Sequence, residues 1–295
     1  MTAVGSTAAS GLAAAGSGAG STVAGAAGGG SGGGEGSARA AGRGGALRQS
    51  WVMAVRALTL LLRDPGPAVN SAVAPAFFFL GFLVPLREVM EARGIDYEQY
   101  MPPAVTIQAM FFVAISSADL MARDINSGML TRVSSMPVTA VAGVAGRLVA
   151  DAVRALLALA VTTGIALAIG FRFERGIGPA LVYLGLLLCF GLGLCLLFDA
   201  IAGFAAHPEH VAAMLMLPQM LLVMLSTGFV PTDGFPGWMQ PWVAHQPVSA
   251  LLGALRDLSA SGGGWGELAP AAGWLAGLWV LGGLLAARAY RRRAW

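Results

Sequence analysis

Six apolar runs of about 20 residues each constrain this chain more than any other feature of its sequence. They cover residues 68–86, 102–122, 141–170, 179–204, 211–231 and 268–287. Runs of this length form helices in a bilayer, because a helix satisfies all of its own backbone hydrogen bonds. Only 11% of the 295 residues are charged, whereas soluble domains carry about a quarter. The sequence therefore predicts an all-α integral membrane protein with six transmembrane helices.

The region before the first run divides into two parts. Residues 1–45 are almost entirely Ala, Gly and Ser, which cannot bury enough apolar surface to offset chain entropy, so we predict a disordered cytoplasmic tail, or else a start codon assigned too early. In residues 46–64, apolar side chains recur at helical spacing while the arginines fall largely elsewhere. This pattern is typical of an interfacial helix, with an ordinary juxtamembrane segment as the alternative. The predicted transmembrane domain, with its entry helix, is 46–293.

The positions of the arginines predict the orientation, because cytoplasmic segments of membrane proteins are enriched in basic residues. With both termini cytoplasmic, the inner segments hold Arg39, Arg43, Arg48, Arg56, Arg63, Arg123, Arg132, Arg147, Arg288, Arg291, Arg292 and Arg293. The outer segments hold Arg87, Arg93, Arg172, Arg175 and Arg256. The loop with Arg172 and Arg175 counts mildly against this topology. We expect a multi-pass protein of the cytoplasmic membrane with both termini inside.

The absence of lysine restricts the chemistry that this chain can perform. All 18 basic residues are arginine, so the chain has no Walker A motif, which needs a lysine on the phosphates. Any ATP hydrolysis would belong to another polypeptide. A formal charge of +3 is too small to indicate nucleic acid, and no catalytic motif or paired carboxylates are evident. We expect a chain that is not itself an enzyme and has no nucleic-acid partner.

The apolar stretch 226–257 cannot form one membrane-spanning helix. Four prolines each remove a backbone donor and disturb the preceding turn, and three glycines lie among them. Short helical pieces can form, with Trp238 and Trp242 four residues apart on one face, a spacing suited to the membrane–water boundary. Non-helical backbone at membrane depth persists only where protein or a cavity satisfies it. We therefore predict a broken, half-inserted outer segment beside a pathway or a subunit contact.

The link between the second and third runs has the features of a mechanical lever. Met129, Leu130 and Val133 can form an apolar helix face, Gly128 allows close approach to another surface, and Pro137 ends the helix. A partner protein that holds such a cytosolic helix moves both attached spans together. A simple loop between helices is the alternative.

Two stretches resemble the ABC-2 type transporter permeases, in particular the daunorubicin-resistance branch of drug and lipid exporters. The first comprises Ser226-Thr227-Gly228-Phe229-Val230-Pro231, Phe235-Pro236-Gly237-Trp238, His245-Gln246-Pro247-Val248-Ser249 and Arg256, which resemble the block before the last span. The second is the link described above, where Asp124, Gly128, Arg132 and Pro137 match the family's coupling helix. Thr131 departs from the pattern, since many members carry glutamate there, and a charge-pair contact from this position is in doubt.

The resemblance implies two sets of site residues and the partners that go with them. The ATPase-coupling set is Asp124, Gly128, Met129, Leu130, Arg132, Val133 and Pro137. The outer re-entrant or gate set is Gly228, Phe229, Pro231, Pro236, Trp238, Trp242, His245, Gln246 and Pro247. The implied partners are cytoplasmic ATPase subunits, which bind ATP and Mg²⁺, and a second permease subunit, identical or different, within the membrane lipid. No cofactor is expected on this chain itself.

Ionisable residues inside predicted spans are costly unless they are paired. Asp151 and Arg154 are three residues apart and can pair on one helix face, while Asp199 and Asp119 are within reach of Arg147 or Arg154. A structural ion pair and a proton or substrate relay are the two interpretations, of which we favour the first. His207, Glu209 and His210 offer too few ligands for a zinc site, and we predict no metal.

We expect the chain to be the permease subunit of an ABC exporter that moves a hydrophobic or amphipathic substrate. A wall rich in Phe and Met favours greasy ligands, although each such residue is as well explained by packing or lipid contact. Its residues are Phe77, Phe78, Phe79, Phe111, Phe112, Met214 and Met216. The alternatives are a membrane scaffold that transports nothing and a secondary transporter, which would usually show inverted repeats and midplane charges.

Overall fold

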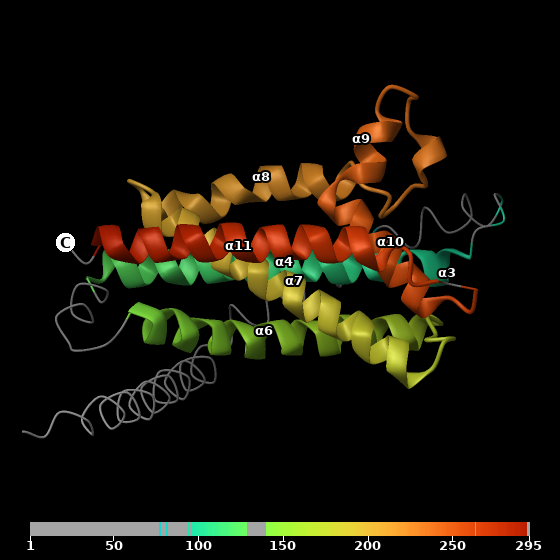
Figure 1. Cartoon of the computed structure of the whole chain (residues 1–295), viewed down its shortest axis with the longest axis horizontal. Coiled ribbons are helices and arrows are strands. Elements are labelled where there is room, and N and C mark those ends of the chain that lie inside the picture. The colour runs from blue at the N-terminus through green and yellow to red at the C-terminus, as the bar shows by residue number, and fades with distance from the viewer. Residues whose placement is uncertain are drawn as a thin grey trace, which may run out of the picture. The chain divides into compact units, whose positions relative to one another are not determined.

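The computed structural model describes residues 96–128, 140–262 and 264–293, together with Phe77, Gly81, Ala92 and Gly94. The predicted tail 1–45, the predicted interfacial helix 46–64 and all but two residues of the first predicted span lie outside the described residues. Among the described residues the secondary structure is entirely helical (Figure 1).

The helices are α3 (Tyr97–Tyr100), α4 (Pro102–Asn126), α6 (Ala140–Ile169), α7 (Ile177–Phe204), α8 (Val211–Met224), α9 (Gln240–His245), α10 (Pro247–Ser259) and α11 (Leu268–Arg293). Two short 3₁₀ helices, η1 (Pro208–His210) and η2 (Thr232–Gly234), lie in the connections.

Within the described residues, four segments are long and apolar enough to cross a membrane. They are Tyr97–Asn126, Val144–Ile169, Ile177–Phe204 and Leu268–Ala289, which correspond to the second, third, fourth and sixth apolar runs. The fifth run differs from its predicted length, because α8 ends at Met224 rather than continuing to 231. Its 14 residues rise about 21 Å, which is less than the thickness of the hydrocarbon core, about 30 Å.

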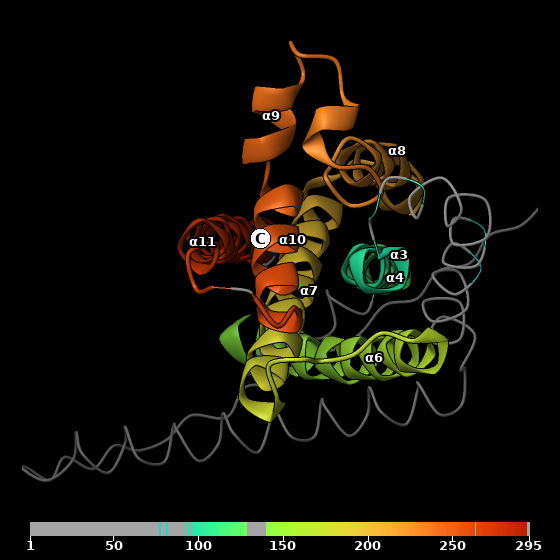
Figure 2. The same cartoon turned by 90° about the vertical axis from the view of Figure 1, so that its right-hand side faces the viewer.

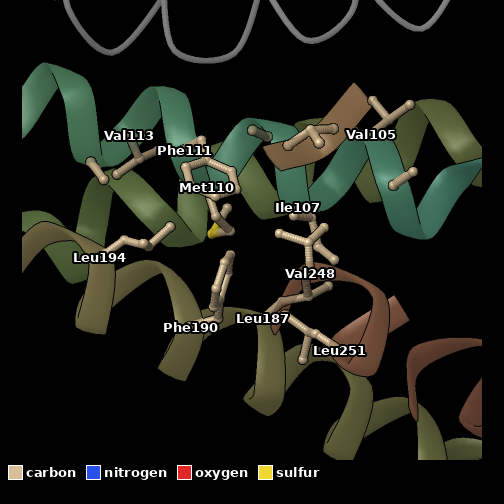
Figure 3. Packing of buried hydrophobic residues seen from close by; sticks show 14 of the residues in the cluster. Val105, Ile107, Met110, Phe111, Val113, Leu187, Phe190, Leu194, Val248 and Leu251 are labelled. Atoms are coloured by element: carbon tan, nitrogen blue, oxygen red, sulfur yellow. The ribbon is translucent and has the colours of Figure 1, made fainter. Parts of the chain in front are cut away.

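α4 is the most buried of the long helices and packs against α6, α7 and α8, while α7 also packs against α11 (Figure 2). Figure 3 shows how α4 and α7 meet: Ile107 and Met110 of α4 face Leu187 and Phe190 of α7, and Val248 of α10 joins them. Several buried contacts between the long helices involve alanines, which let helix backbones approach closely in a membrane.

The segment after α8 is broken into short pieces, as its prolines and glycines predict. α9 stands away from the long helices in both views (Figures 1 and 2). α10 instead packs among α4, α7 and α11, and nine of its 13 residues are buried. The two predicted tryptophans do not share a helical face, because Trp238 lies in the turn before α9 and only Trp242 is inside that helix. Both side chains are exposed.

The connections gather at two ends of the helices. We call them the Tyr100 end, where α4 starts and α6 finishes, and the Asn126 end, where α4 finishes and α6 starts. At the Tyr100 end the link between α6 and α7 is joined to the link between α10 and α11. The Glu174 amide donates to the Ser259 carbonyl at 3.0 Å, and the Ser261 amide donates to the Glu174 carboxylate at 2.8 Å.

The two arginines that counted against the predicted topology are also bonded at the Tyr100 end. Arg175 donates to the Asp257 and Gly264 carbonyls at 3.0 and 2.9 Å and lies over the Trp265 ring. Arg172 donates to the Leu167 carbonyl at 3.0 Å. Both guanidinium groups are therefore hydrogen-bonded to nearby backbone carbonyls.

Candidate functional site

Arg147 of α6 is the centre of a polar network near the Asn126 end of the long helices. Its guanidinium contacts the Asp124 carboxylate of α4 at 2.7 Å and the Asp199 carboxylate of α7 at 2.9 Å. It also donates to the Ser117 carbonyl at 3.2 Å, and the Ser117 hydroxyl donates to Asp199 at 2.9 Å. Charge-assisted bonds of this kind are about twice as strong as neutral ones. One side chain thus holds three long helices together.

The structure shows which of the ion pairs that the sequence leaves open for Asp199 and Asp119 are formed. Asp199 reaches Arg147, as one of the predicted alternatives had it. Asp119 pairs with Arg123 instead, at 2.8 Å, because residues four apart on a helix are neighbours on its surface. That second pair is exposed and contributes little to stability.

Asp151 and Arg154, which the sequence assigned to a structural ion pair, lie in contact one turn apart on α6. Both side chains are buried, and both are only partly satisfied within the described part of the chain. The second carboxylate oxygen of Asp151 and the Nε of Arg154 have no hydrogen-bond partner there. A buried pair of this kind is expensive to break, since either partner alone would be an uncompensated charge.

The predicted coupling stretch begins where α4 ends. Gly128 follows the helix with a φ of 68°, and its amide donates to the Ile125 carbonyl at 3.0 Å. A glycine in the left-handed region is a common helix stop, because it has no Cβ to clash. Asp124 and Gly128 are the two predicted coupling residues that are described. Met129, Leu130, Arg132, Val133 and Pro137 lie outside the described residues.

A second connection at the Asn126 end joins α4 to the turn before α8. The Asn126 side-chain amide donates to the Glu209 carboxylate of η1 at 3.2 Å. The backbone amide of Glu209 itself and this bond from Asn126 hold the pKa of the carboxyl below its usual range. The His207 ring lies 3.4 Å from the same carboxylate, and both side chains are exposed.

At the Tyr100 end, Arg256 of α10 joins the predicted outer set to α3. Its guanidinium lies 3.5 Å from the Tyr100 ring centroid and donates to the Thr227 and Gly228 carbonyls at 2.8 and 3.1 Å. It also donates to the Tyr100 carbonyl at 3.3 Å, while the Tyr100 hydroxyl donates to the Thr227 carbonyl at 2.7 Å. These bonds satisfy backbone carbonyls that the broken segment leaves free of helical partners.

The outer set divides into a buried and an exposed part. Gly228, Phe229 and Gln246 are buried, and Gln246 donates to the Leu225 carbonyl at 2.6 Å. His245 is exposed, and its Nδ1 lies 2.8 Å from the Pro241 carbonyl oxygen. The remaining members, Pro231, Pro236, Trp238, Trp242 and Pro247, are at least partly exposed.

A cavity of about 410 Å³ lies between the two polar ends, lined by α4, α7, α8, α10 and α11. Among the described residues that line it, the only strongly polar side chain is that of Gln219 of α8, which accepts a hydrogen bond from Gln108 of α4 at 3.0 Å. Phe111, one of the wall residues expected from the sequence, lines the cavity. Phe77, Met214 and Met216 are exposed and do not.

A model of the family described as ABC-2 family transporter protein matches residues 72–288, which is most of the chain. The chain belongs to the ABC-2 transporter family. The resemblance read from the two motif stretches is therefore confirmed.

Curated relatives place the permease in the daunorubicin-resistance branch. A probable doxorubicin resistance ABC transporter permease protein, DrrC of Mycobacterium tuberculosis, is 31% identical over 252 residues, covering 83% of this chain and 88% of the relative. The daunorubicin resistance permease DrrB1 of Streptomyces coeruleorubidus is 28% identical over 256 residues, covering 87% and 89%. DrrB of M. tuberculosis, a doxorubicin resistance permease, is 30% identical over 242 residues, covering 77% and 83%.

Sequence reasoning missed three of the residues that organise these sites. Tyr100 lies in the short helix α3, before the second apolar run, and the buried pair Gln108 and Gln219 lie in helices that read as plain apolar runs. The signal available was modest: a glutamine inside a membrane span needs a polar partner, and two such spans contain one each. Which glutamine meets which partner depends on the packing of α4 against α8.

Proposed function

We propose that this permease exports a hydrophobic or amphipathic compound, drug-like or lipid-like, out across the cytoplasmic membrane. Its relatives carry names of ABC transporter permeases of doxorubicin and daunorubicin resistance, and they align over most of both chains. The chain has no lysine for a P-loop, so a separate cytoplasmic ATPase supplies the energy. ATP and Mg²⁺ bind to that partner, and no cofactor is required on the permease.

The contact of Arg147 with Asp124 is the observation that carries the mechanism. Asp124 lies in the last turn of α4, four residues before the glycine that opens the coupling stretch. A displacement of that stretch by the ATPase is passed to α6 through Arg147 and to α7 through Asp199. Three helices then shift as a unit, which is the requirement for opening a path on one side of the membrane.

The topology proposed is six spans with both termini cytoplasmic, an interfacial helix at 46–64 and a re-entrant outer segment before the last span. The short helices favour this arrangement, because α10 packs among the long helices while α9, with exposed Trp242, stands away from them. The outer set acts as a gate in this scheme, held in place by Arg256. Six spans form half of a translocation unit, so the permease pairs with a second permease subunit, identical or different.

The test is purification of the full-length tagged permease from its native membrane in mild detergent, with and without ATP. We expect a cytoplasmic protein with a P-loop in stoichiometric amount. The variant G128D/L130E should lose that protein, because it places two charges in the coupling stretch. The matched control is G262D, an exposed position at the Tyr100 end with open space around it.

A second variant separates attachment from coupling. R147Q should retain the ATPase, since Arg147 is not one of the predicted coupling residues, while export by membrane vesicles falls about tenfold or more. Loss of the ATPase in R147Q but not in G128D/L130E would contradict the assigned roles. If no ATPase co-purifies under any nucleotide condition, the export proposal loses its energy source and a scaffold or a secondary transporter becomes the better interpretation.

A further inference from the structure

The last turn of α11 concentrates positive charge at the Asn126 end. Arg288, Arg291, Arg292 and Arg293 lie within six consecutive residues, and the helix continues through all of them. The part of α11 that is long and apolar enough to cross a membrane ends at Ala289. α11 and α4 finish at the same end of the molecule (Figure 1). We call these four arginines the basic turn, which in a bilayer lies at the level of the lipid headgroups.

The described carboxylates at the Asn126 end have partners other than the basic turn. Each of them contacts an arginine or an amide of another helix or turn, and they are Asp119, Asp124, Asp199 and Glu209. Arg288 is exposed, and no ion pair joins it to a described carboxylate. These carboxylates therefore do not neutralise the positive charge of the basic turn.

One face of α11 is occupied by α7 up to the start of the basic turn. A Cβ on Gly282 would lie 3.3 Å from the Leu197 amide nitrogen of α7. A Cβ on Gly203 of α7 would lie 2.9 Å from the Cβ of Ala289. Both distances are shorter than ordinary contacts, so this face of α11 leaves no room for another molecule.

A different face of α11 is exposed and leads into the basic turn. Trp274, Leu281 and Leu284 are 49%, 51% and 54% exposed, and intervals of seven and three residues place them on one helix face. Positions 288, 291 and 292 follow Leu284 by four, seven and eight residues, so they continue the same face. This face is therefore an apolar strip that ends in three arginine positions.

An acidic phospholipid has the chemistry to match both parts of this face. Acyl chains pack against apolar side chains, and the arginine guanidinium is a planar fork that can bind two phosphate oxygens at once. Basic clusters directly after a membrane span attract acidic headgroups, and each added cation strengthens the attraction about fivefold. A zwitterionic lipid offers the same chains without the net charge, so it lacks half of the match.

We propose that this face of α11 binds an acidic phospholipid, with its headgroup on the basic turn and its acyl chains on the apolar strip. The lipid is a bound component of the permease and not its cargo, so the proposal does not depend on the export function. Its place is close to the Arg147 network, because Ala286 and Ala289 of α11 line a small hollow together with Arg147 and Asp199.

The test uses the full-length permease, purified in detergent and stripped of native lipid. The two probes are palmitoyl-oleoyl phosphatidylglycerol, which is anionic, and palmitoyl-oleoyl phosphatidylcholine, which has the same chains and no net charge. Native mass spectrometry counts the lipid molecules that remain bound at each concentration. We expect the anionic lipid to bind about tenfold more tightly or better, with an advantage that shrinks as the salt concentration rises. Equal retention of the two lipids would overturn the proposal.

Arg288 and Arg123 supply a matched pair. Both are exposed at the Asn126 end, but Arg123 pairs with Asp119. R288Q should weaken binding of phosphatidylglycerol about threefold to tenfold, whereas R123Q should change it less than about twofold although it removes the same charge. Equal effects of the two variants would show that the lipid responds to the total charge of the chain and not to the basic turn.

The whole basic turn is tested with two triple variants. R288Q/R291Q/R292Q should abolish the preference for phosphatidylglycerol, and an unchanged preference would place the lipid elsewhere. R288K/R291K/R292K keeps the charge and should keep the preference, so it covers the case in which the glutamine variant folds poorly. Loss of the preference in a folded lysine variant would contradict a site based on charge.

Two further measurements distinguish the lipid from other occupants. Glycerophosphoglycerol, the same headgroup without acyl chains, should not displace phosphatidylglycerol at millimolar concentration, and displacement would show that the turn binds a free phosphate diester. An acidic surface of the ATPase is the alternative occupant. If R288Q/R291Q/R292Q loses a co-purifying ATPase but binds phosphatidylglycerol normally, the basic turn is a protein contact and the lipid assignment is wrong.

Discussion

At the scale of single residues, Arg256 shows how a charge is accommodated beside apolar helices without a carboxylate. Among the described residues its partners are three carbonyl oxygens and the face of Tyr100. The planar guanidinium reaches several acceptors at once, which an ammonium on a flexible stem does not. Arg256 therefore connects the turn after α8 to the residue that precedes α4 through these hydrogen bonds.

We expect R256Q to lower the free energy of unfolding by about 2–3 kcal/mol, because charged hydrogen bonds are lost and the carbonyls become unsatisfied. R256K should lower the free energy of unfolding by an intermediate amount, since lysine keeps the positive charge but not the planar guanidinium that reaches several acceptors at once. Unfolding in mixed micelles, followed by circular dichroism, measures the difference.

The control for this comparison is R123A. Arg123 is exposed and, among the described residues, pairs with exposed Asp119, so its removal should cost less than about 1 kcal/mol. If R256Q and R123A are equally stable, the carbonyl contacts of Arg256 contribute nothing and its proposed place in the gate is wrong.

At the scale of elements, the turn between α8 and η2 depends on its close approach to α4. A Cβ on Gly228 would lie 3.1 Å from the Cβ of Ala104 and 3.0 Å from the hydroxyl oxygen of Ser226. Both are tighter than ordinary contacts, and Ala104 belongs to a buried face of α4. The turn can therefore lie this close to α4 because Gly228 has no side chain.

We predict that G228V destabilises the permease by about 1–3 kcal/mol, the usual range for overpacking. G237V serves as the matched control, since nothing lies within 4 Å of a Cβ built on Gly237. Thermal unfolding of the two variants in the same detergent provides the measurement. A partial rescue of G228V by A104G would tie the loss to this single contact, whereas a stable G228V would contradict the close packing.

At the scale of the whole molecule, the separation of polar clusters between the two ends leads to a prediction of sidedness. The arginine distribution predicts that the Tyr100 end lies outside, and Arg172 and Arg175 at that end donate to backbone carbonyls.

Cysteine labelling tests this orientation directly. In a background with C189A and C195A, S261C should react with a membrane-impermeant maleimide in intact cells, and E209C should react only after the membrane is opened. Both positions are exposed and lie at opposite ends. The reverse pattern would invert the topology and place the coupling stretch where no cytoplasmic ATPase can reach it.

Much of the helical architecture was predictable, because it depends on local properties of the chain. Length and apolarity determine which segments cross a bilayer, and the match to α4, α6, α7 and α11 follows from this. The prolines between 226 and 257 were sufficient to predict a broken segment, because proline has no backbone N–H to donate within a helix. The Asp151–Arg154 contact was also predictable, because residues three apart on a helix are neighbours on its surface.

Other features depend on which faces of different helices meet, and helical periodicity does not specify this in a uniformly apolar run. Nothing local in the sequence distinguishes Arg147 from Arg154 as the bridge to Asp124 and Asp199, or pairs Gln108 with Gln219. The cavity is likewise formed by five helices, none of which carries a pattern that marks it. The sequence determined the four long apolar helices, the broken segment and the family, because these follow from local chemistry. Only the tertiary structure decided the partners of the buried polar groups, because each partner is brought within hydrogen-bond distance by packing between residues far apart in the chain.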